Sequence, residues 1–492
     1  MTFPDKKLVL GLPRDFVWGA STSSFQIEGA TREDGRGESI WDVRCRTKGK
    51  VANGDTGDIA CDHYHRYPED IALMKKLGVG AYRFSVAWPR VLPQGFGVSN
   101  EKGLDYYDRV IDATLEAGIE PWLCLYHWDL PQALQDKAGW ANRDSAGWFA
   151  DYAALAARRY GDRVKRWATF NEFSVFTLFG YAIDWGAPGI TDRNLHLRAI
   201  HHVNLAHGAG VDAIRALVAG ASVGAIHNVQ PVVPEKDTAA DREAAADLHE
   251  HWNLAFPDPQ LLASYPPRLS RAIEQYVAPG DMARICRPID WFGLNHYGPI
   301  FAKADPDSVH GFGWGSAPAD APKSDIGWPV FPGMFADTLV EVGRRYRLPI
   351  YVTENGCGGN DGSPGETPDV RGRITDKHRL SYLKQHIAAM RAAIAKGADV
   401  RGYFVWSLLD NFEWGSGYAQ RFGIVRVDYA TQKRTPKASY RWYADLITAA
   451  RRGKSRPVTT PVRGEPDASR RRRRPRTPSD ASPGRSVRAR GR

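Results

Sequence analysis

Eight short apolar runs recur along most of the chain, and longer stretches with helical periodicity separate them. Each run is nearly continuous in hydrophobic residues, whereas a half-exposed strand would alternate between apolar and polar positions. Continuous runs are typical of parallel strands that are covered on both faces. The runs that we predict to be strands are Phe16–Ala20, Ala81–Trp88, Glu120–His127, Arg166–Glu172, Ser222–Asn228, Trp291–Tyr297, Ile350–Glu354 and Gly402–Trp406.

The stretches between these runs have the spacing of amphipathic helices. The clearest forms a single apolar stripe with steps of three or four positions: Leu380, Leu383, Ile387, Met390 and Ile394. Thr375 or Asp376 is predicted to cap the start of this helix, and Gly397 is predicted to end it. The segment Asp105–Glu116 has a similar pattern, which stops at Gly118. Each helix therefore leads directly into the next strand.

Eight alternations of strand and helix predict an α/β fold, a single closed (β/α)8 TIM barrel. An open doubly wound sheet is the alternative, but no Gly-x-Gly-x-x-Gly turn follows an early strand. The longer connections, around Arg32–Asp58, Pro231–Pro288 and Phe301–Gly333, are predicted to be extended loops. In such barrels the loops that follow the strands form the wall of the active site at the C-terminal face.

The net charge of +10 is concentrated at the C-terminus. Residues 451–492 contain 15 Arg or Lys and 3 Asp or Glu, whereas residues 1–450 contain 51 and 53. We therefore predict a nearly neutral barrel domain over residues 1–450. The segment 451–492 is rich in Arg, Pro and Ser and has almost no apolar residues, which predicts a disordered tail. Its run Arg470–Arg474 lacks interleaved aromatic residues, so no nucleic-acid partner is expected.

Cysteine usage and hydropathy bound the expected compartment. The five cysteines are scattered, odd in number and without metal-type spacing, which argues against a disulfide framework: Cys45, Cys61, Cys124, Cys286 and Cys357. No apolar stretch is long enough for a signal peptide or a membrane span. We therefore expect a cytoplasmic protein with no membrane association.

Two of the predicted strands end on a glutamate. Thr169-Phe170-Asn171-Glu172 closes the fourth run, and Tyr351-Val352-Thr353-Glu354-Asn355-Gly356 contains the end of the seventh. The carboxyl ends of barrel strands meet at one face, so both acids are expected at the same rim. A pair of carboxylates there suits glycosidic bond cleavage, in which one acid transfers a proton and the other attacks or stabilises a cation.

The other strand ends carry amides, an imidazole, indoles and one guanidinium. Amides and carboxylates can read sugar hydroxyls, and indoles can stack on sugar rings, so the predicted bowl resembles a sugar pocket. It has neither a Ser-His-Asp order nor a Gly-rich phosphate loop. The residues at these ends are Gln26, Arg83, His127, Trp128, Asn171, His227, Asn228, Asn295, His296, Tyr297, Trp406, Glu413 and Trp414.

These motifs together resemble family 1 of the glycoside hydrolases, of the bacterial β-glucosidase kind. The resemblance runs from about Phe16 to about Tyr443 and covers most of the chain. Beside the two glutamate motifs it rests on Phe16-Val17-Trp18-Gly19-Ala20-Ser21, Tyr82-Arg83-Phe84-Ser85, Tyr126-His127-Trp128-Asp129 and Trp406-Ser407-Leu408-Leu409-Asp410-Asn411-Phe412-Glu413-Trp414.

The resemblance implies a role for each of these positions. Glu172 would be the general acid/base, and Glu354 the nucleophile, with Arg83 and Tyr297 holding it. Asn171 would bind the sugar 2-hydroxyl. The other implied contacts are Gln26, His127, Glu413 and Trp414 at the remaining hydroxyls, Trp406 beneath the ring, Phe422 closing the sugar subsite, Trp328 beside the leaving group, and Asn295 and Trp128 lining the pocket.

This assignment carries physical expectations. The pKa of Glu172 should be raised toward about 6–7 so that it begins protonated, and Arg83 should favour the ionised form of Glu354. We expect a retaining reaction, for which the carboxyl carbons lie about 5–5.5 Å apart. Glu413 is predicted to repel a phosphate, which favours a non-phosphorylated sugar.

The sequence thus predicts a retaining exo-β-glycosidase that removes terminal β-D-glucosyl residues from a small-molecule β-glycoside, with β-galactosides and β-fucosides as further candidates. The alternative is a non-catalytic sugar-binding relative on the same barrel. No cofactor and no metal are expected. The pairs His63/His65, His201/His202 and His249/His251 are interpreted as hydrogen-bonded or solvated histidines. The sequence is compatible with a monomer or an oligomer.

Overall fold

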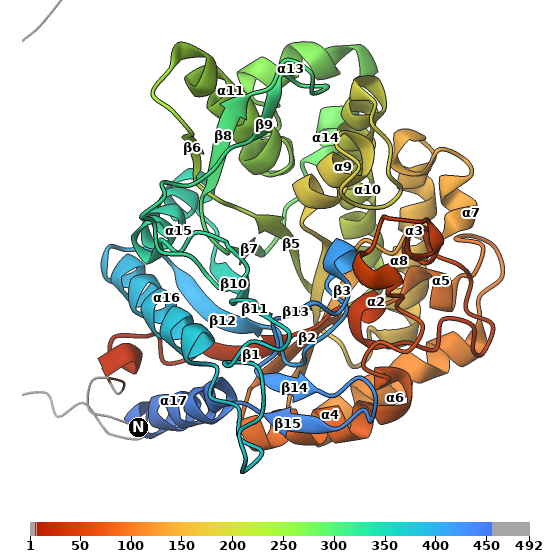
Figure 1. The fold of residues 1–492 in the computed structure, drawn as a ribbon. Coiled ribbons are helices and arrows are strands. Elements are labelled where there is room, and N and C mark those ends of the chain that lie inside the picture. The colour runs from red at the N-terminus through yellow and green to blue at the C-terminus, as the bar shows by residue number, and fades with distance from the viewer. Residues whose placement is uncertain (1–4, 6, 455–492) are drawn as a thin grey trace, which may run out of the picture. The chain divides into compact units, whose positions relative to one another are not determined.

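The structure, a computed structural model, describes Asp5 and residues 7–454. Eight parallel strands form a closed barrel, ringed by helices in Figure 1, in the order β1-β12-β10-β7-β5-β4-β3-β2. The strands are β1 (Val17–Ser21), β2 (Ala81–Ser85), β3 (Glu120–Tyr126), β4 (Arg166–Asn171), β5 (Ser222–Asn228), β7 (Trp291–Asn295), β10 (Ile350–Asn355) and β12 (Val400–Trp406). The predicted (β/α)8 barrel and all eight of its strands are confirmed, although the predicted second strand is too long.

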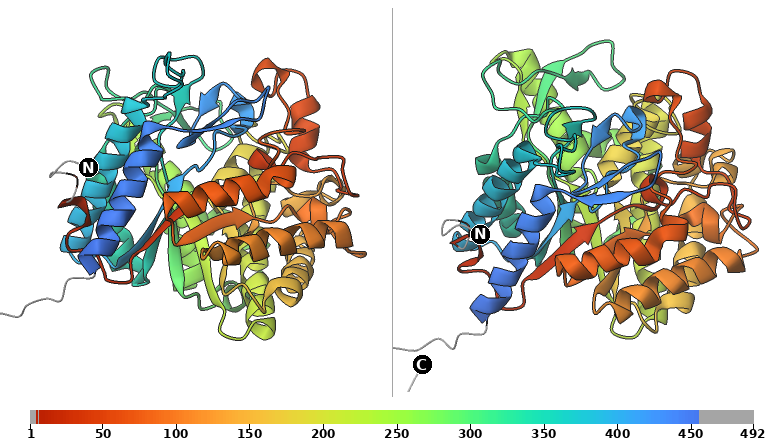
Figure 2. Two further views of the ribbon diagram at one scale, coloured as in Figure 1. Left: turned by 90° about the horizontal axis from the view of Figure 1, so that it is seen from below. Right: turned by 60° about the horizontal axis from the view of Figure 1, so that its bottom comes forward.

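Long helices follow the strands and cover the outside of the barrel. They are α4 (His63–Leu77), α6 (Glu101–Glu116), α8 (Ser145–Tyr160), α10 (Arg193–Leu217), α15 (Pro332–Tyr346), α16 (Lys377–Ala395) and α17 (Ala438–Lys454). Helix α17 packs beside α16 and α4, where the ring of helices closes (Figure 2). It extends four residues into the predicted tail, and residues 455–492 lie outside the described part of the chain.

Shorter elements build the face at the carboxyl ends of the strands. The helices are α2 (Ser24–Ile27), α3 (Ile40–Arg46), α5 (Trp88–Val91), α7 (Gln132–Gln135), α9 (Phe173–Tyr181), α11 (Ala239–His249), the π-helical η4 (Glu250–Leu254), α12 (Pro257–Leu262), α13 (Pro267–Ile273), α14 (Asp281–Ile285) and η6 (Trp414–Ser416). The small strands are β6 (Val232–Pro234), β8 (Ile300–Ala304), β9 (Phe312–Trp314), β11 (Gly359–Asn360), β13 (Gln420–Arg421), β14 (Val425–Val427) and β15 (Arg434–Pro436). Half of them lie in the connections predicted as extended loops: α3, α11, η4, α12, α13, α14, β6, β8 and β9.

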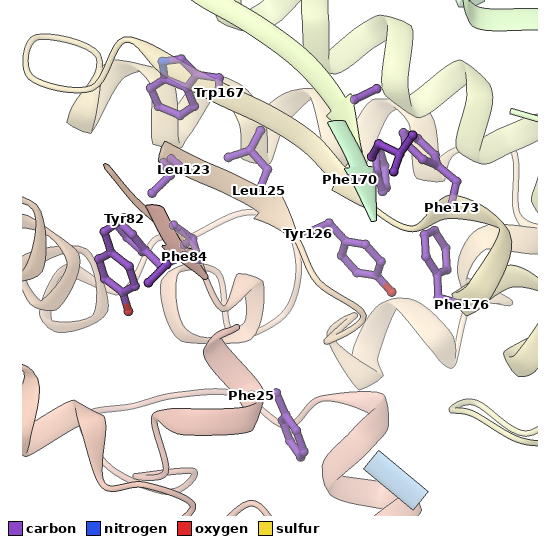
Figure 3. Packing of buried hydrophobic residues seen from close by; sticks show 14 of the residues in the cluster. Phe25, Tyr82, Phe84, Leu123, Leu125, Tyr126, Trp167, Phe170, Phe173 and Phe176 are labelled. Atoms are coloured by element: carbon purple, nitrogen blue, oxygen red, sulfur yellow. The ribbon is translucent and has the colours of Figure 1, made fainter. Parts of the chain in front are cut away.

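Both faces of the barrel strands are buried, which explains the continuous apolar runs. Four large rings from alternate positions meet inside the barrel: Trp122, Trp291, Tyr351 and Phe404. Gly19 and Gly224 make room for them, because a Cβ atom at either glycine would lie 2.2 Å from a ring atom. Leu123 and Leu125 of β3 belong instead to the large hydrophobic cluster that also contains Trp167 and Phe170 (Figure 3).

A second buried feature is an ion-pair network that joins the loops after β10 and β12 to the start of α17. Its members are three acids and three bases: Glu366, Asp376, Asp410, Arg379, Arg421 and Lys437. Lys437 Nζ lies 2.5 Å from Glu366 and 2.7 Å from Asp410. Asp376 precedes α16 as predicted, but its carboxylate does not cap the helix and instead accepts from Arg379 and Ser439.

No helix within residues 7–454 combines the length and the apolar character needed to cross a bilayer.

Candidate active site

A cavity of about 640 Å³ opens at the carboxyl ends of the barrel strands. It is lined by ten of the residues predicted from the sequence: His127, Trp128, Glu172, Tyr297, Trp328, Glu354, Trp406, Glu413, Trp414 and Phe422. The strand ends therefore converge on one site, as a closed barrel requires.

Four further predicted residues are buried behind the cavity wall: Gln26, Arg83, Asn171 and Asn295. They hold the lining side chains by hydrogen bonds. Asn171 links the lining residue His127 to two of the buried residues. Its Oδ1 accepts from Arg83 and Asn295, and its Nδ2 donates to His127. One amide hydrogen of Asn171 remains for a further acceptor, because a primary amide has two.

Glu172 follows β4 directly and has a left-handed backbone conformation, with φ of 54°, at the junction with α9. Its Oε1 accepts from Asn228 Nδ2 at 2.7 Å and from Asn295 Nδ2 at 2.9 Å. Burial, and then the negative charge of Glu354, raise the pKa of Glu172 to about 8. The hydrogen bonds from the two amides lower this pKa, but by less than burial and the charge of Glu354 raise it. The carboxyl therefore carries a proton at neutral pH.

Glu354 lies in β10, next to an irregularity in its pairing with β7. Its Oε1 accepts from Arg83 Nη1 at 2.5 Å, and its Oε2 accepts from Tyr297 Oη at 2.7 Å. Both oxygens are thus fixed by donors, one of them charged. Charge-assisted hydrogen bonds of this kind favour an ionised carboxylate and set its orientation. The predicted contacts of Arg83 and Tyr297 with Glu354 are present.

His127 follows β3 directly and is a neutral imidazole. Burial, and then the positive charge of Arg83, lower its pKa well below the ordinary value. Its Nε2 accepts from Asn171, so Nδ1 carries the proton. Among the described residues Nδ1–H has no acceptor, although the atom is buried at the cavity wall. A ligand hydroxyl is a suitable acceptor for such a donor.

Glu413 faces the same space from the loop after β12. Gln26 Nε2 donates to it at 3.4 Å, and the same amide donates to the Phe412 carbonyl. Burial, and then the charges of Glu354 and Glu172, raise the pKa of Glu413 to about 8. At neutral pH it is therefore mostly a neutral acid that can donate as well as accept. The repulsion of phosphate that the sequence predicted is correspondingly weaker.

Aromatic side chains line much of the remaining wall. The ring of Trp406 lies 5.8 Å from His127 at an interplanar angle of 13°, and Trp414 lies 4.5 Å from Trp128. Phe422 is buried beside Tyr297, whereas Trp328 is 42% exposed at the entrance. These flat faces suit the axial C–H surface of a pyranose.

The sequence reading missed one direct neighbour of Glu172 and the outer wall. Asn228 was identified at the end of a strand but was given no role. The outer wall comes from α9, the loop after it, η4 and β9, where no periodic pattern marks it, and is formed by Phe179, Trp185, Trp252 and Trp314. The chain has 16 tryptophans, and no local signal distinguished these three.

Comparison with known proteins tests the family resemblance over the whole length of the match. The family model of glycosyl hydrolase family 1 matches residues 10–452.

The chain belongs to glycosyl hydrolase family 1.

Curated members of family 1 match it along nearly their whole length. β-Glucosidase A of Thermotoga maritima is 43% identical over 88% of this chain and 97% of its own. A bifunctional β-D-glucosidase/β-D-fucosidase of Bifidobacterium breve is 41% identical over 88% and 98%. The solved T. maritima β-glucosidase in complex with deoxynojirimycin superposes with a TM-score of 0.84, covering 89% of this chain and 99% of that one. The resemblance inferred from the motifs is therefore confirmed, while the roles of single residues stay predictions.

Proposed function

We propose that the protein is a retaining β-glucosidase in which Glu172 is the acid/base and Glu354 the nucleophile. The observation that carries this proposal is the contrast between two neighbouring carboxyls. Glu172 is held by neutral amides and has a pKa of about 8, whereas Glu354 is bound by the Arg83 guanidinium. One acid with a proton and one carboxylate without it are what glycosidic cleavage needs.

In the first step, a carboxylate oxygen of Glu354 forms a bond to the anomeric carbon. The bond from that carbon to the glycosidic oxygen breaks, and the leaving oxygen takes the proton of Glu172. The products are a glycosyl ester on Glu354 and the free alcohol. Tyr297 and Arg83 keep the attacking carboxylate in one orientation before the step.

In the second step, the charges of the two glutamates are exchanged: Glu354 is a neutral ester and Glu172 is ionised. The ester on Glu354 no longer carries the negative charge that helps to raise the pKa of Glu172. Glu172, now ionised, takes a proton from water, whose oxygen attacks the anomeric carbon and releases Glu354. Two displacements restore the original configuration, and a carboxyl separation of about 5–5.5 Å is expected for this course.

We propose that the sugar is recognised by donors and acceptors that have no partner within the described part of the chain or that can exchange one. The Nδ1–H of His127 and the carboxyl of Glu413 face the cavity, and Trp406 supplies a flat surface beside them. We propose a non-phosphorylated glucoside as the main substrate, because a phosphate dianion in the cavity would meet the negative charge of Glu354.

β-Galactosides and β-fucosides are proposed as further substrates. The B. breve relative is named for both glucosidase and fucosidase activity, and a solved relative binds a galacto-hydroximolactam. A panel of p-nitrophenyl β-glycosides, with cellobiose and a 6-phospho-β-glucoside, ranks these sugars. NMR of the first anomer released reports retention: β-glucose should appear first, and α-glucose would contradict the mechanism.

The same panel separates catalysis from sugar binding alone. A non-catalytic relative would bind glucosides without releasing p-nitrophenol. We find no feature of the site that favours this alternative, since both carboxyls and their partners are in place.

We also propose that residues 1–450 form the catalytic domain and that the basic segment after it is dispensable for turnover. Because α17 continues to Lys454, the truncation is best made after that residue. Removal of residues 455–492 should leave kcat within about twofold, and a large fall would assign the segment a catalytic role.

A further inference from the structure

We propose that His196, His251 and His310 form a binding site for a divalent cation of the late transition series, such as Zn²⁺, beside the outer wall of the cavity. The candidate ligand nitrogens of the three residues all lie within 4.8 Å of one another. The site is independent of the proposed glycosidase chemistry, and none of the three histidines lines the cavity.

The three side chains come from separate elements that the fold brings together. His196 lies in the first turn of α10, His251 lies in the π-helical η4, and His310 lies in the loop between β8 and β9. In Figure 1, β8 and β9 lie beside α11, the helix that leads directly into η4. The sequence pair His249/His251 gave no sign of the cluster, because His249 bonds to Asn253 while His251 turns toward the other two.

His251 is oriented as a metal ligand is. Its Nδ1 donates to the backbone carbonyl of Asp247 at 2.9 Å, which leaves the lone pair on Nε2. That Nε2 is buried and has no hydrogen-bond partner among the described residues. A backbone carbonyl on the far nitrogen is the usual arrangement behind a metal-bound imidazole, since it fixes both the tautomer and the ring.

The other two histidines already share one proton across a short contact. His196 Nδ1 and His310 Nε2 lie 2.8 Å apart. In a tetrahedral zinc site with Zn–N bonds of about 2.0–2.1 Å, neighbouring nitrogens are about 3.3 Å apart. The pair must therefore open by about half an ångström, a small movement for a side chain in the β8–β9 loop. The shared proton moves to the outer nitrogen of the imidazole that carried it.

The donor set of the cluster suits a late transition metal. Arg193 opposes a cation, and the Asp247 carboxylate near His251 partly offsets it. Three imidazoles without a carboxylate favour zinc, nickel or copper over magnesium or calcium.

Aromatic packing alone does not account for the cluster. The rings of His251 and His310 do contact Phe312, at 5.3 and 5.5 Å. Packing of this kind explains why the rings are close, but it leaves the buried Nε2 of His251 unsatisfied. A cation at the centre satisfies that atom and leaves a fourth position for water, as in three-histidine zinc sites.

Occupancy would stabilise the outer wall of the cavity. Trp252 follows His251 directly, and Trp314 ends the short strand after His310. Trp252 Nε1 donates to Asn228 Oδ1 at 3.2 Å, and Asn228 in turn donates to Glu172. A metal at the three histidines would therefore hold the segment that positions both the wall and a partner of Glu172.

The test uses the full chain, stripped of metal with a chelator and titrated with Zn²⁺ against a chromophoric chelator. We expect one equivalent to bind, and His310→Ala and His251→Ala each to weaken the binding at least about tenfold. His65→Ala, which removes an exposed histidine bound to Asp62 and Glu33, is the matched control and should bind as the parent does. Equal affinity in the parent and in His310→Ala would overturn the proposal, as would the absence of stoichiometric binding in the parent.

A spectroscopic measurement guards against variants that misfold. Co²⁺ added to the metal-free parent should give the visible absorption of a nitrogen-rich four-coordinate ion, and His310→Gln should lose it while keeping the parent's circular dichroism. Retention of the same spectrum in a folded His310→Gln variant would contradict ligation by this residue.

Discussion

Two groups of buried charged side chains in this protein follow opposite rules. The ion-pair network after β10 and β12 contains three acids and three bases, and each acid contacts at least one base. The cavity contains three carboxyls, on Glu172, Glu354 and Glu413, and Arg83 is in contact with only one of them. The first group is balanced, and the second has an excess of acid.

The pKa values follow this difference. Glu366 in the network is buried, yet the charges of Arg379 and Lys437 hold its pKa well below the ordinary value. The pKa values of Glu172 and Glu413 in the cavity are raised to about 8, because burial and the neighbouring carboxylates outweigh the hydrogen bonds of both groups and, at Glu172, the charge of Arg83. In the network, cationic partners stabilise each buried carboxylate. In the cavity, the carboxyls outnumber the cationic partners, so a carboxyl that must deliver a proton can keep it.

The largest effect is expected from removal of Glu354, the one cavity carboxylate that is paired with Arg83. Glu354→Gly should lower kcat on an aryl β-glucoside by about 10⁴-fold or more, because no side chain can form the ester. Azide should restore turnover by entering the vacated space. Glu354→Gln is the matched control, since it keeps the volume and should not be rescued. Full activity in the glycine variant would overturn the assignment.

A substitution in the ion-pair network should change the free energy of unfolding and leave kcat nearly unchanged. Lys437→Met leaves Glu366 and Asp410 each without one cation and should lower the free energy of unfolding by about 3–5 kcal/mol. The kcat of the folded fraction should stay within about twofold.

Urea denaturation at pH 7 measures this change. Lys396→Met is the control, because Lys396 pairs with Asp337 on the surface and its removal should cost less than about 1 kcal/mol. Equal losses of unfolding free energy in the two variants would mean that Lys437 in the buried network contributes no more to stability than a surface lysine.

Glu172→Gln tests the sign of the linkage in the cavity. The pKa of Glu172 is about 8 in the folded state, above the ordinary value of 4.5. The folded protein therefore binds this proton more tightly, and its contribution to stability falls as pH rises from about 4.5 to 8. Glutamine cannot ionise, so the variant should gain roughly 1–3 kcal/mol over the parent at pH 9 and nothing near pH 4.

Denaturation curves at several pH values show whether the gain depends on pH. Glu116→Gln, at an exposed helical position, should show no such trend. A pH-independent difference between Glu172→Gln and the parent would refute a raised pKa in the folded state.

The smallest expected effect concerns Asn228. Its amide donates to Glu172 and so favours the ionised form, which means that Asn228→Ala should raise the pKa of Glu172. The alkaline limb of kcat/KM should move up by about 0.5–1 pH unit. Gln230→Ala serves as the control, because Gln230 donates to Asn228 and has no hydrogen bond to Glu172. A downward shift in Asn228→Ala would be inconsistent with this contact.

Much of this architecture could be predicted from the sequence, for identifiable reasons. Barrel strands that are buried on both faces read as continuous apolar runs, so all eight were found, although the second was extended into α5 at Trp88. Motifs at strand ends located both glutamates and most of their neighbours, because a closed barrel brings those ends together.

The remainder depends on tertiary contacts that no local pattern encodes. The cap predicted at Asp376 failed because Arg379 and Ser439 bind its carboxylate. The outer wall at Trp185, Trp252 and Trp314 comes from a loop, the short η4 and the short strand β9, none of which has a periodic pattern long enough to predict it. The raised pKa of Glu413 follows first from its burial and then from the charges of Glu354 and Glu172, and both depend on the folded structure.

The central claim is that burial, together with the excess of acid in the cavity, keeps the proton on Glu172. Titration of Glu172 by carbon NMR, with ¹³C-labelled glutamate and Glu172→Gln for assignment, tests it directly. We predict a pKa of about 8 in the free enzyme and a fall of at least about one unit once a 2-deoxy-2-fluoro glucoside has trapped Glu354 as its ester. A pKa near 4.5 in the free enzyme, or one that does not change on trapping, would contradict the account.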